Sequence, residues 1–478
     1  MFKTITDQIK RDKDYPERQH RLSVFRRVLD GELYDHLEHG FYEEKTSSDE
    51  YIPLRKRRPC VRYNLSKIVV DDSVGLLFSE GHFPDIEADD DAVRDVLPTL
   101  VKETKLNDVM TQAAIIGSVG SVFILFRVLN NRVFFTVMET QFITPSWDPA
   151  APDTLSGVTE RYKVCGENLI AAGIPVDDDS AVYWYQRDWT DAQEIHYIPL
   201  KVSDAQDGVK PLVDITRTVS HNLGFVPGVW IKNLPGGKDV DGACTFKEAI
   251  DTQIEIDYQL SQGGRGLKYS SDPTLLIKEP STNDGSMVKG AANAIIVEEG
   301  GDAKLLEING TATQAVIDYV KFLRECALES VHGNRSNAEK ISVAQSGRAM
   351  EMMNAALIML ADRLRIPYAE GGLLSLLKMV VKASHKFHLV VDGNKIDPLK
   401  EDVKLSLRWP AWYPPTSQDQ LTQAQAIQTH VVSGTLSQET GTRIISADYD
   451  IEDVEDEREK IKAEKPLESK NPASGPTV

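Results

Sequence analysis

Cysteine is scarce in this chain, and its few residues lie far apart. The four cysteines are Cys60, Cys165, Cys244 and Cys326, and no CxxC pair occurs. Zinc ribbons and dithiol redox sites need closely spaced pairs, so the sequence excludes a locally assembled site of either kind. We therefore expect four isolated, buried thiols.

Long apolar stretches are also missing. No segment approaches the roughly 20 consecutive apolar residues that a membrane-spanning helix requires. The first 21 residues are polar and charged, whereas a signal peptide carries an apolar stretch of about 7–15 residues. The hydrophobic fraction of 41% is that of a soluble globular chain. We expect a protein that is made and used in the cytoplasm, without membrane contact.

Positive charge is in deficit. The chain has 54 Lys and Arg against 73 Asp and Glu, which gives a formal net charge of -19. A protein that coats nucleic acid neutralises phosphates with Lys and Arg, so any contact with DNA must be sparse, local or weak. A short basic run at residues 55–58 is interpreted as a solvated loop, with phosphate contact as the alternative.

The glycine motifs of nucleotide-binding enzymes are incomplete. Residues 236–238 (GGK) resemble the end of a phosphate-binding loop, but Asp239 follows where Ser or Thr should bind magnesium, and the upstream glycine is missing. Gly117 and Gly120 lack the third glycine of a dinucleotide-binding fingerprint and follow a helix. The sequence therefore excludes both sites.

Candidate metal ligands lack the partners that a metal centre needs. His385 and His388 are three residues apart without an HExxH motif, so a structural role is favoured over a shared metal. The acidic triplets at residues 89–91 and 177–179 lie in polar loops, where solvation is favoured over a two-metal nuclease site. We expect no catalytic residues, no metal and no cofactor.

The N-terminal part is predicted to be mainly helical. Residues 1–45 hold two amphipathic stretches, and Asn64 stands as the cap of a helix whose apolar residues recur at helical spacing through Leu77. Residues 106–116 continue as a helix that Gly117 ends. At 478 residues, the chain is long enough for two or more domains.

Strands are predicted next. Residues 121–127 and 132–138 alternate like two strands around an Asn130-Asn131 turn. Residues 158–230 continue this strand-like pattern and indicate a β-rich lobe with many aromatic side chains. We interpret these aromatics as core or cross-strand pairs, with base stacking as the alternative.

A helix, a small β module and a second helix follow. Apolar residues every four positions predict a helix over 243–262, ended by Gly263-Gly264. Three short strands are predicted at residues 274–278, 294–298 and 304–308, separated by Pro280, Asn283-Asp284-Gly285 and Gly300-Gly301. The second helix spans 311–331, and its near-heptad stripe suits packing against like helices: Val316, Val320, Leu323, Ala327 and Val331.

The C-terminal part begins with a polar segment from His332 to Gln345. A helix opens near Ser346 and should kink at Pro367. An edge strand is predicted from Lys404, then a helix over 418–432 that Gly434 ends, a short helix from Ser437, an acidic run and a disordered tail at 466–478.

These features together resemble the portal proteins of tailed bacteriophages, of the SPP1-like, siphophage type, over residues 20–465. Four stretches carry the resemblance: residues 63–71 (YNLSKIVVD) with 75–78 (GLLF), the helix, β module and helix of 243–331, residues 346–350 (SGRAM), and residues 434–440 (GTLSQET) before the acidic run. None of them is a catalytic signature.

The resemblance implies an α+β portal fold that assembles into a ring. Its parts would be a wing at residues 1–242, a first stem helix at 243–269, a clip at 270–310, a second stem helix at 311–331, a tunnel loop at 332–345, a kinked helix and C-terminal wing part at 346–414, and a crown at 415–465. The clip is short for the family. Packing of the stem would rest on Val316, Val320, Leu323 and Ala327.

The resemblance also implies a function. About twelve copies would form a ring at one capsid vertex of the virion, assembled in the host cytoplasm, through which double-stranded DNA is packaged and ejected. The partners would be the terminase large subunit, capsid and scaffolding proteins, and a head-tail adaptor. The chain would not be an enzyme.

Three basic residues are candidates for contact with DNA in the tunnel. Arg335, Lys340 and Arg348 could place positive rings near the phosphates, with pairing to Glu339 or Glu351 as the alternative. The competing hypothesis for the whole chain is a metal-dependent nucleic-acid-processing enzyme of a phage, with the acidic clusters as its metal site.

Overall fold

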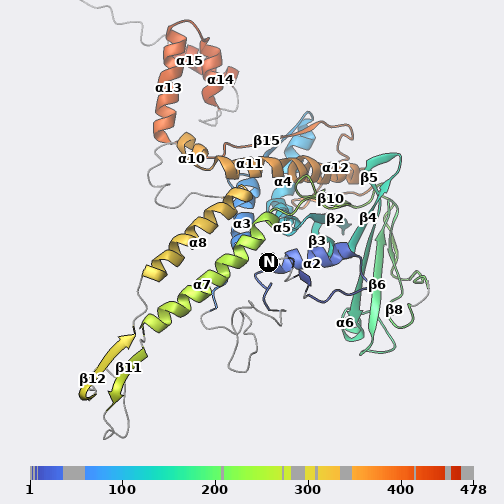
Figure 1. The fold of residues 1–478 in the computed structure, drawn as a ribbon. Helices are drawn as coiled ribbons and strands as arrows, with labels where there is room; N and C mark the ends of the chain where they lie inside the picture. Colours follow the sequence, from blue (N-terminus) through green and yellow to red (C-terminus); the bar gives the residue numbers. More distant parts are fainter. Residues whose placement is uncertain are drawn as a thin grey trace, which may run out of the picture. The chain divides into compact units, whose positions relative to one another are not determined.

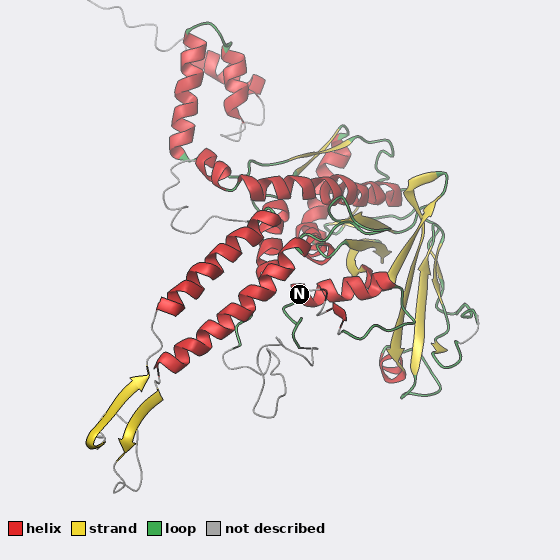
Figure 2. Cartoon of the chain, viewed as in Figure 1, coloured by secondary structure: helices red, strands yellow, loops and turns green. Residues whose placement is uncertain are grey.

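The computed structural model describes residues 3, 6–7, 9–35, 60–205, 209–271, 274–280, 297–306, 311–333, 347–413, 416–446 and 454–464. The chain divides into two compact units. One is formed by Met1–Arg335 with Ala356–Pro410, and the other by Ser336–Ala355 with Ala411–Val478. Helices and strands are both abundant, which confirms the α+β class (Figures 1 and 2).

The first unit contains two larger antiparallel sheets. A three-stranded sheet has the order β10-β2-β3, and a six-stranded sheet has the order β4-β5-β6-β7-β9, with β8 paired to β6. The strands are β2 (Ser121–Leu129), β3 (Arg132–Glu139), β4 (Ile143–Asp148), β5 (Ala151–Cys165), β6 (Val182–Trp189), β7 (Gln193–His196), β8 (Leu200–Lys201), β9 (Val219–Ser220) and β10 (Gly228–Lys232). The predicted β-rich lobe is therefore confirmed.

The turn between β2 and β3 explains their register. Asn130 and Asn131 both have positive φ, 49° and 64°, as a type I′ hairpin turn requires, and asparagine tolerates this conformation. Leu129 consequently pairs with Arg132, and the register continues without a shift to Val122 and Glu139.

Helices of the first unit accompany these sheets. They are α2 (Glu17–Leu29), α3 (Leu65–Phe78), α4 (Asp91–Thr104), α5 (Leu106–Gly117), α6 (Gly166–Ala171), α7 (Ile250–Ser271), α8 (Thr311–Ser330), α11 (Ala355–Arg365) and α12 (Leu374–Ser384), with short 3-10 turns at Thr140–Phe142 and Lys247–Ala249. Three two-stranded pairs complete it: β1 (Asp85–Ala88) with β15 (Leu405–Arg408), β11 (Thr274–Pro280) with β12 (Val297–Leu306), and β13 (Val390–Val391) with β14 (Asn394–Lys395).

The aromatic residues of the lobe are core residues. Trp189 is fully buried and lies 6.0 Å, ring to ring, from Phe123 of β2, which in turn lies 6.4 Å from Trp230 of β10. These side chains connect the two larger sheets through one apolar cluster. Tyr183 and Tyr185 belong to a second cluster with Leu169 and Ile174. The interpretation of these aromatics as core, rather than as a base-stacking surface, is confirmed for these residues.

An ion-pair network fastens α2 to the β-sheet. The buried Asp241 carboxylate accepts hydrogen bonds from Arg18 (2.8 and 2.9 Å), Arg21 (3.0 Å) and the Ser121 hydroxyl (2.6 Å). Arg18 also donates to two backbone carbonyls and lies over the Trp230 ring. A buried carboxylate needs this degree of pairing, so α2 is held in one position.

The helix predicted to open near Ser346 is divided in two. α10 (Gly347–Met353) ends before Asn354, and α11 begins after it. The predicted kink at Pro367 takes the form of a π-helical segment, Ile366–Leu373, between α11 and α12. Proline has no N–H to bond the carbonyl four residues earlier, and the wider π turn takes up this break.

Three helices make up most of the second unit: α13 (Ser417–Val432), α14 (Gln438–Ser446) and α15 (Val454–Glu464). Thr416 and Asp419 form a capping box that starts α13, and Gly434, with φ of 71°, follows its end. α14 comes close to α13 at Gly441, where an added Cβ would lie 3.1 Å from Ile427. The helices predicted at 418–432 and from Ser437 are confirmed.

Several predictions lie outside the described residues. They include the basic run at 55–58, most of the polar segment 332–345, and the tail at 466–478. All four cysteines are free thiols, as expected, but the predicted burial is wrong: Cys60, Cys165 and Cys244 are half-buried, and Cys326 is exposed. Among the helices that are described, none is both long enough and apolar enough to cross a membrane.

Substitution of Gly117 by alanine tests how tightly α5 packs against its neighbours. An added Cβ would clash with the buried Tyr368 hydroxyl, which donates a 3.0 Å hydrogen bond to Asn233. We expect Gly117→Ala to lower the free energy of unfolding by about 1–3 kcal/mol, as overpacked cores do. Gly75→Ala in α3 is the control, because nothing lies within 4 Å of its added Cβ. Chemical denaturation measures both, and equal stabilities of the two variants would contradict this account.

Candidate functional site: a helical hairpin and its polar anchor

Helices α7 and α8 lie side by side, and the β11–β12 pair lies beyond one end of the two helices (Figure 1). The two helices approach each other closely at Gly263, where an added Cβ would lie 2.9 Å from Val316 Cγ1. The prediction that Gly263-Gly264 ends the first helix is wrong, and so is its start at 243. Glycine costs roughly 1 kcal/mol in a helix, but here its small size admits the neighbouring helix, and α7 continues to Ser271.

Among the described residues of the β module there are two strands, where the sequence predicts three. β11 and β12 pair antiparallel from Thr274 opposite Leu306 to Lys278 opposite Asp302, with a register shift before Pro280. Gly300-Gly301, predicted to separate two strands, lies inside β12. The pairing runs to Asp302 and resumes at Val297, so Gly300-Gly301 lies in the register shift, where glycine is common, and Pro280 on the opposite strand lacks an N–H.

A row of polar residues anchors α7 to the segment that precedes α3. Gln253, Asp257 and Ser261 are spaced four residues apart, so they share one face of α7, and all three are buried. Asp257 Oδ1 accepts from the Tyr63 backbone N–H at 2.6 Å, and Ser261 Oγ accepts from the Val61 N–H at 3.0 Å. We call Gln253, Asp257 and Ser261 the α7 anchor.

Ser66 completes this contact. Its backbone N–H and its hydroxyl both donate to Gln253 Oε1, at 2.9 and 2.6 Å. Asn64 caps α3 by accepting from Lys67 N–H, and its side-chain amide donates to the Leu29 carbonyl at 2.7 Å. The stretch at 63–66 thus starts α3, bonds α7 and touches the end of α2.

Asp257 has an unusual environment for a carboxyl group. The Tyr34 hydroxyl donates to Asp257 Oδ2 at 2.8 Å, while Arg62 directs its guanidinium to Asp35, at 2.6 and 3.1 Å. Burial raises the pKa of Asp257 to about 7, and the hydrogen bonds from Tyr63 and Tyr34 oppose this shift only in part. The pKa of the buried Tyr34 is raised well above its usual value, mainly by burial.

The apolar stripe of α8 faces inward where the sequence places it. Ala327 is fully buried, and Val316, Val320 and Leu323 are half-buried. α8 ends in a turn in which His332 adopts a left-handed φ of 55° and Gly333 N–H bonds the Leu328 carbonyl at 2.8 Å. The polar segment therefore leaves α8 from a defined C-cap.

Three further apolar side chains on α8 are exposed. Ile317 is 41% exposed, Tyr319 44% and Phe322 60%. At about 100° per residue, Ile317 lies on one side of the inward stripe, whereas Tyr319 and Phe322 lie on the other. These three side chains leave apolar surface exposed on both flanks of α8 in the single chain.

The proposed DNA-contacting residues are not characterised by the structure. Arg335 and Lys340 lie outside the described residues, and Arg348 lies in α10 with its side chain undescribed. The sequence analysis missed the α7 anchor, although polar residues at i, i+4 and i+8 on a helix with apolar neighbours are a detectable signal. It identified residues 63–71 as informative without finding their partner.

The candidate metal ligands have structural roles. His385 Nε2 lies 2.6 Å from the Leu399 carbonyl, Asp90 caps α4 by accepting from Val93 N–H, and Asp178 accepts from Ser180. Within the part of the chain that the structure describes, no group of three or more His, Cys, Asp or Glu side chains could hold a metal ion.

The amino-acid sequence matches a known protein family over nearly its whole length. A family model described as "Phage portal protein, SPP1 Gp6-like" matches residues 10–470. The chain belongs to the phage portal protein family. This is a structural, non-enzymatic family of bacteriophage virions, so the α+β architecture is a portal fold.

Two solved structures that match this portal protein come from gene transfer agent (GTA) particles. A chain in the neck of an empty GTA particle is 9% identical with a TM-score of 0.41, over 80% of this chain and 88% of that chain. A chain in the virion of the native GTA particle is 10% identical with a TM-score of 0.40, over 88% and 98%. No curated protein matches the sequence.

The anchor should make folding stability depend on pH. A carboxyl with a raised pKa keeps its proton in the folded state between about pH 4 and 7, where the unfolded state releases it, so the free energy of unfolding falls as pH rises through this window. Asp257→Asn removes this contribution. We expect its stability relative to the natural sequence to increase from pH 5 to pH 8.

Denaturant unfolding at several pH values measures this difference. Asp318→Asn, at an exposed position of α8, is the matched control and should give a curve parallel to that of the natural sequence. Parallel curves for Asp257→Asn as well would show that the Asp257 carboxyl does not titrate in this window.

Proposed function

We propose that about twelve copies of this chain close into a ring at one capsid vertex, with an axial channel for double-stranded DNA during packaging and ejection. The terminase large subunit would dock on the ring during packaging, and a head-tail adaptor would replace it afterwards. Capsid and scaffolding proteins would contact its outside while it assembles in the host cytoplasm. Family membership over residues 10–470 supports this proposal.

In this proposal, each part of the subunit has a task. α7 and α8 are the stem that surrounds the channel, and the β11–β12 pair is the clip, which faces the motor and the neck proteins. The remaining assignments are a wing at 1–242 and 346–414, a tunnel loop at 332–345 and a crown at 415–465. The α7 anchor would then join the stem to the wing through residues 61–66.

The observation that favours a ring is the pair of exposed apolar flanks on α8. A subunit in a cyclic ring has two neighbours, which it contacts with two different surfaces. Ile317 on one flank, and Tyr319 and Phe322 on the other, offer an apolar surface toward each neighbour. A twofold dimer would cover one patch only.

The charge of the chain suits a conduit. A ring of chains with a net charge of -19 each repels DNA over much of its surface, so the duplex does not adhere as it slides. Arg335, Lys340 and Arg348 would supply the few attractive contacts, each modest and screened by salt.

Phe322→Asp tests the ring interface. Because Phe322 is exposed in the single chain, the variant should fold but fail to close rings, since the interface would bury an unpaired charge. Negative-stain images and the sedimentation coefficient measure assembly. Phe322→Leu is the matched control and should retain rings.

Leu323→Asp provides the contrast on the inward stripe. It should lower the melting temperature of the chain and also prevent closed rings, because it places a charge on the half-buried stripe of α8. Intact rings from Phe322→Asp would contradict the assignment of this flank to the interface, and intact, stable rings from Leu323→Asp would contradict the stem assignment.

Lys340→Ala tests the tunnel. The variant should leave ring assembly unchanged and alter either the rate of packaging or the retention of DNA in virions, because one ring of weak phosphate contacts is lost. Virion yield and DNA content per particle are the readouts. If the variant gave the same virion yield and the same DNA content per particle as the natural sequence, a tunnel role for Lys340 would be excluded.

A further inference from the structure

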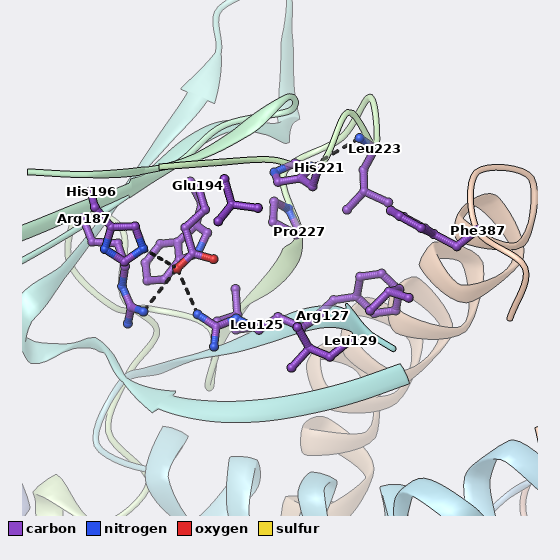
Figure 3. A pocket seen from close by; sticks show the side chains of 14 residues that line it. Leu125, Arg127, Leu129, Arg187, Glu194, His196, His221, Leu223, Pro227 and Phe387 are labelled. Atoms are coloured by element: carbon purple, nitrogen blue, oxygen red, sulfur yellow. Dashed lines mark hydrogen bonds and ion pairs between the residues drawn. The ribbon is translucent and has the colours of Figure 1, made fainter. Parts of the chain in front are cut away.

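A cavity of about 380 Å³ lies between the two larger sheets of the first unit. One wall comes from Leu125–Leu129 of β2, the other from β6, β7 and the segment after β9, and Phe387 reaches it from the end of α12 (Figure 3). We call it the intersheet cavity. Its volume is within the range of pockets that hold small ligands. Neither the ring nor the DNA channel of the proposed function uses it.

Charged groups gather at one end of this cavity. Arg127 and Arg187 donate to the same oxygen of Glu194, Oε1, at 3.0 and 3.3 Å, and His196 Nε2 lies 3.4 Å from it (Figure 3). Arg187 also pairs with Glu160 at 2.8 Å, so its charge is matched. Arg127, in contrast, has one described carboxylate partner, Glu194, which also bonds Arg187 and lies near His196.

Most N–H donors of the Arg127 guanidinium group therefore have no described acceptor. Only its NH2 group makes a hydrogen bond, while its Nε is buried without a partner and its NH1 makes no described bond. Three other nitrogens of residues that line the cavity, Trp189 Nε1, His196 Nδ1 and His221 Nε2, also lack partners among the described residues. His196 Nδ1 is an acceptor when Nε2 donates to Glu194. The His221 ring accepts from Leu223 N–H through Nδ1, so Nε2 carries the proton and is a donor. Donors outnumber acceptors at this end.

The other end of the cavity is apolar. Leu223 and Phe387 lie opposite the charged cluster, with Leu129 at the β2 wall (Figure 3). A ligand that fits must therefore carry acceptor atoms at one end and an apolar body at the other. A carboxylate is the group that satisfies several converging N–H donors, and it pairs with a guanidinium through strong, charge-assisted bonds.

We propose that the intersheet cavity binds a carboxylate joined to an apolar group, with Arg127 holding the carboxylate and Leu223 and Phe387 packing against the apolar group. Such chemistry occurs in a free organic acid and at the C-terminus of a polypeptide that ends in an apolar residue. Glu194 acts as the internal competitor, because it occupies the NH2 group of Arg127 when the ligand is absent.

Titration calorimetry on the full-length protein tests this with 4-phenylbutyrate and its neutral amide. We expect saturable binding of the acid at one site per chain, and at least tenfold weaker binding of the amide. Arg127→Met should weaken binding of the acid at least tenfold. Arg132→Met, on the adjacent strand β3 and paired with Glu103 outside the cavity, is the matched control and should not change it.

Glu194→Gln gives a readout in the opposite direction. Removing the competing charge should tighten binding of 4-phenylbutyrate at least threefold, and this variant keeps the test decisive even where Arg127→Met folds poorly. Absence of saturable binding, equal binding of acid and amide, or unchanged affinity in Arg127→Met would overturn the proposal. Weaker binding in Glu194→Gln would overturn the competitor role.

A second ligand separates the two sources of the carboxylate. Acetyl-Ala-Ala-Phe with a free C-terminus should compete with 4-phenylbutyrate for the same site. Tighter binding of the peptide supports a polypeptide terminus as the natural ligand, and tighter binding of the small acid supports a free organic acid. Failure of the peptide to compete excludes the polypeptide source.

Discussion

Burial of the Asp257 carboxyl group is the constraint on which the organisation around α7 depends. A carboxyl in this position needs hydrogen-bond donors from its surroundings, because water does not reach it. The donors come from Tyr63 N–H and the Tyr34 hydroxyl, which belong to the segments before α3 and after α2. Gln253 and Ser261 lie on the same face of α7, are buried as well, and accept hydrogen bonds from Ser66 and Val61. Three distant parts of the sequence must therefore meet at one place before α7 can be buried.

The Asp241 network acts in the same way on the other side of α2. Arg18 and Arg21 bring α2 to the loop after β10, so both ends of this helix region are held by buried carboxyl groups, those of Asp241 and Asp257. In the proposed ring, a load on α7 and α8 would pass through residues 61–66 to α3 and α2. Hydrogen bonds to buried acceptors suit this task, because they are costly to leave unmade. Packing at Gly263 and Val316 would keep the two stem helices together.

Much of the fold could be predicted from local signals. The Asn130-Asn131 turn, the cap at Asn64 and the stripe at Val316, Val320, Leu323 and Ala327 each follow from short-range chemistry, and the structure contains all of them. Errors arose where tertiary contact outweighs propensity. Gly263 favours the end of a helix in isolation, but the close approach of Val316 makes glycine suitable within α7. Gly300-Gly301 falls at the register shift of β12 and not in a turn between two strands. The partners of Asp257 could not be predicted, because nothing local links residue 257 to residues 34 and 63.

The central claim is that this portal protein forms a closed ring around a channel lined by α7 and α8. Cryo-electron microscopy of the purified full-length protein tests it most directly. The account predicts rings of about twelve subunits with an axial opening wide enough for a DNA duplex, and with Ile317 of each subunit close to Tyr319 or Phe322 of the next. Monomers, twofold dimers, or rings in which these α8 flanks face solvent would contradict it.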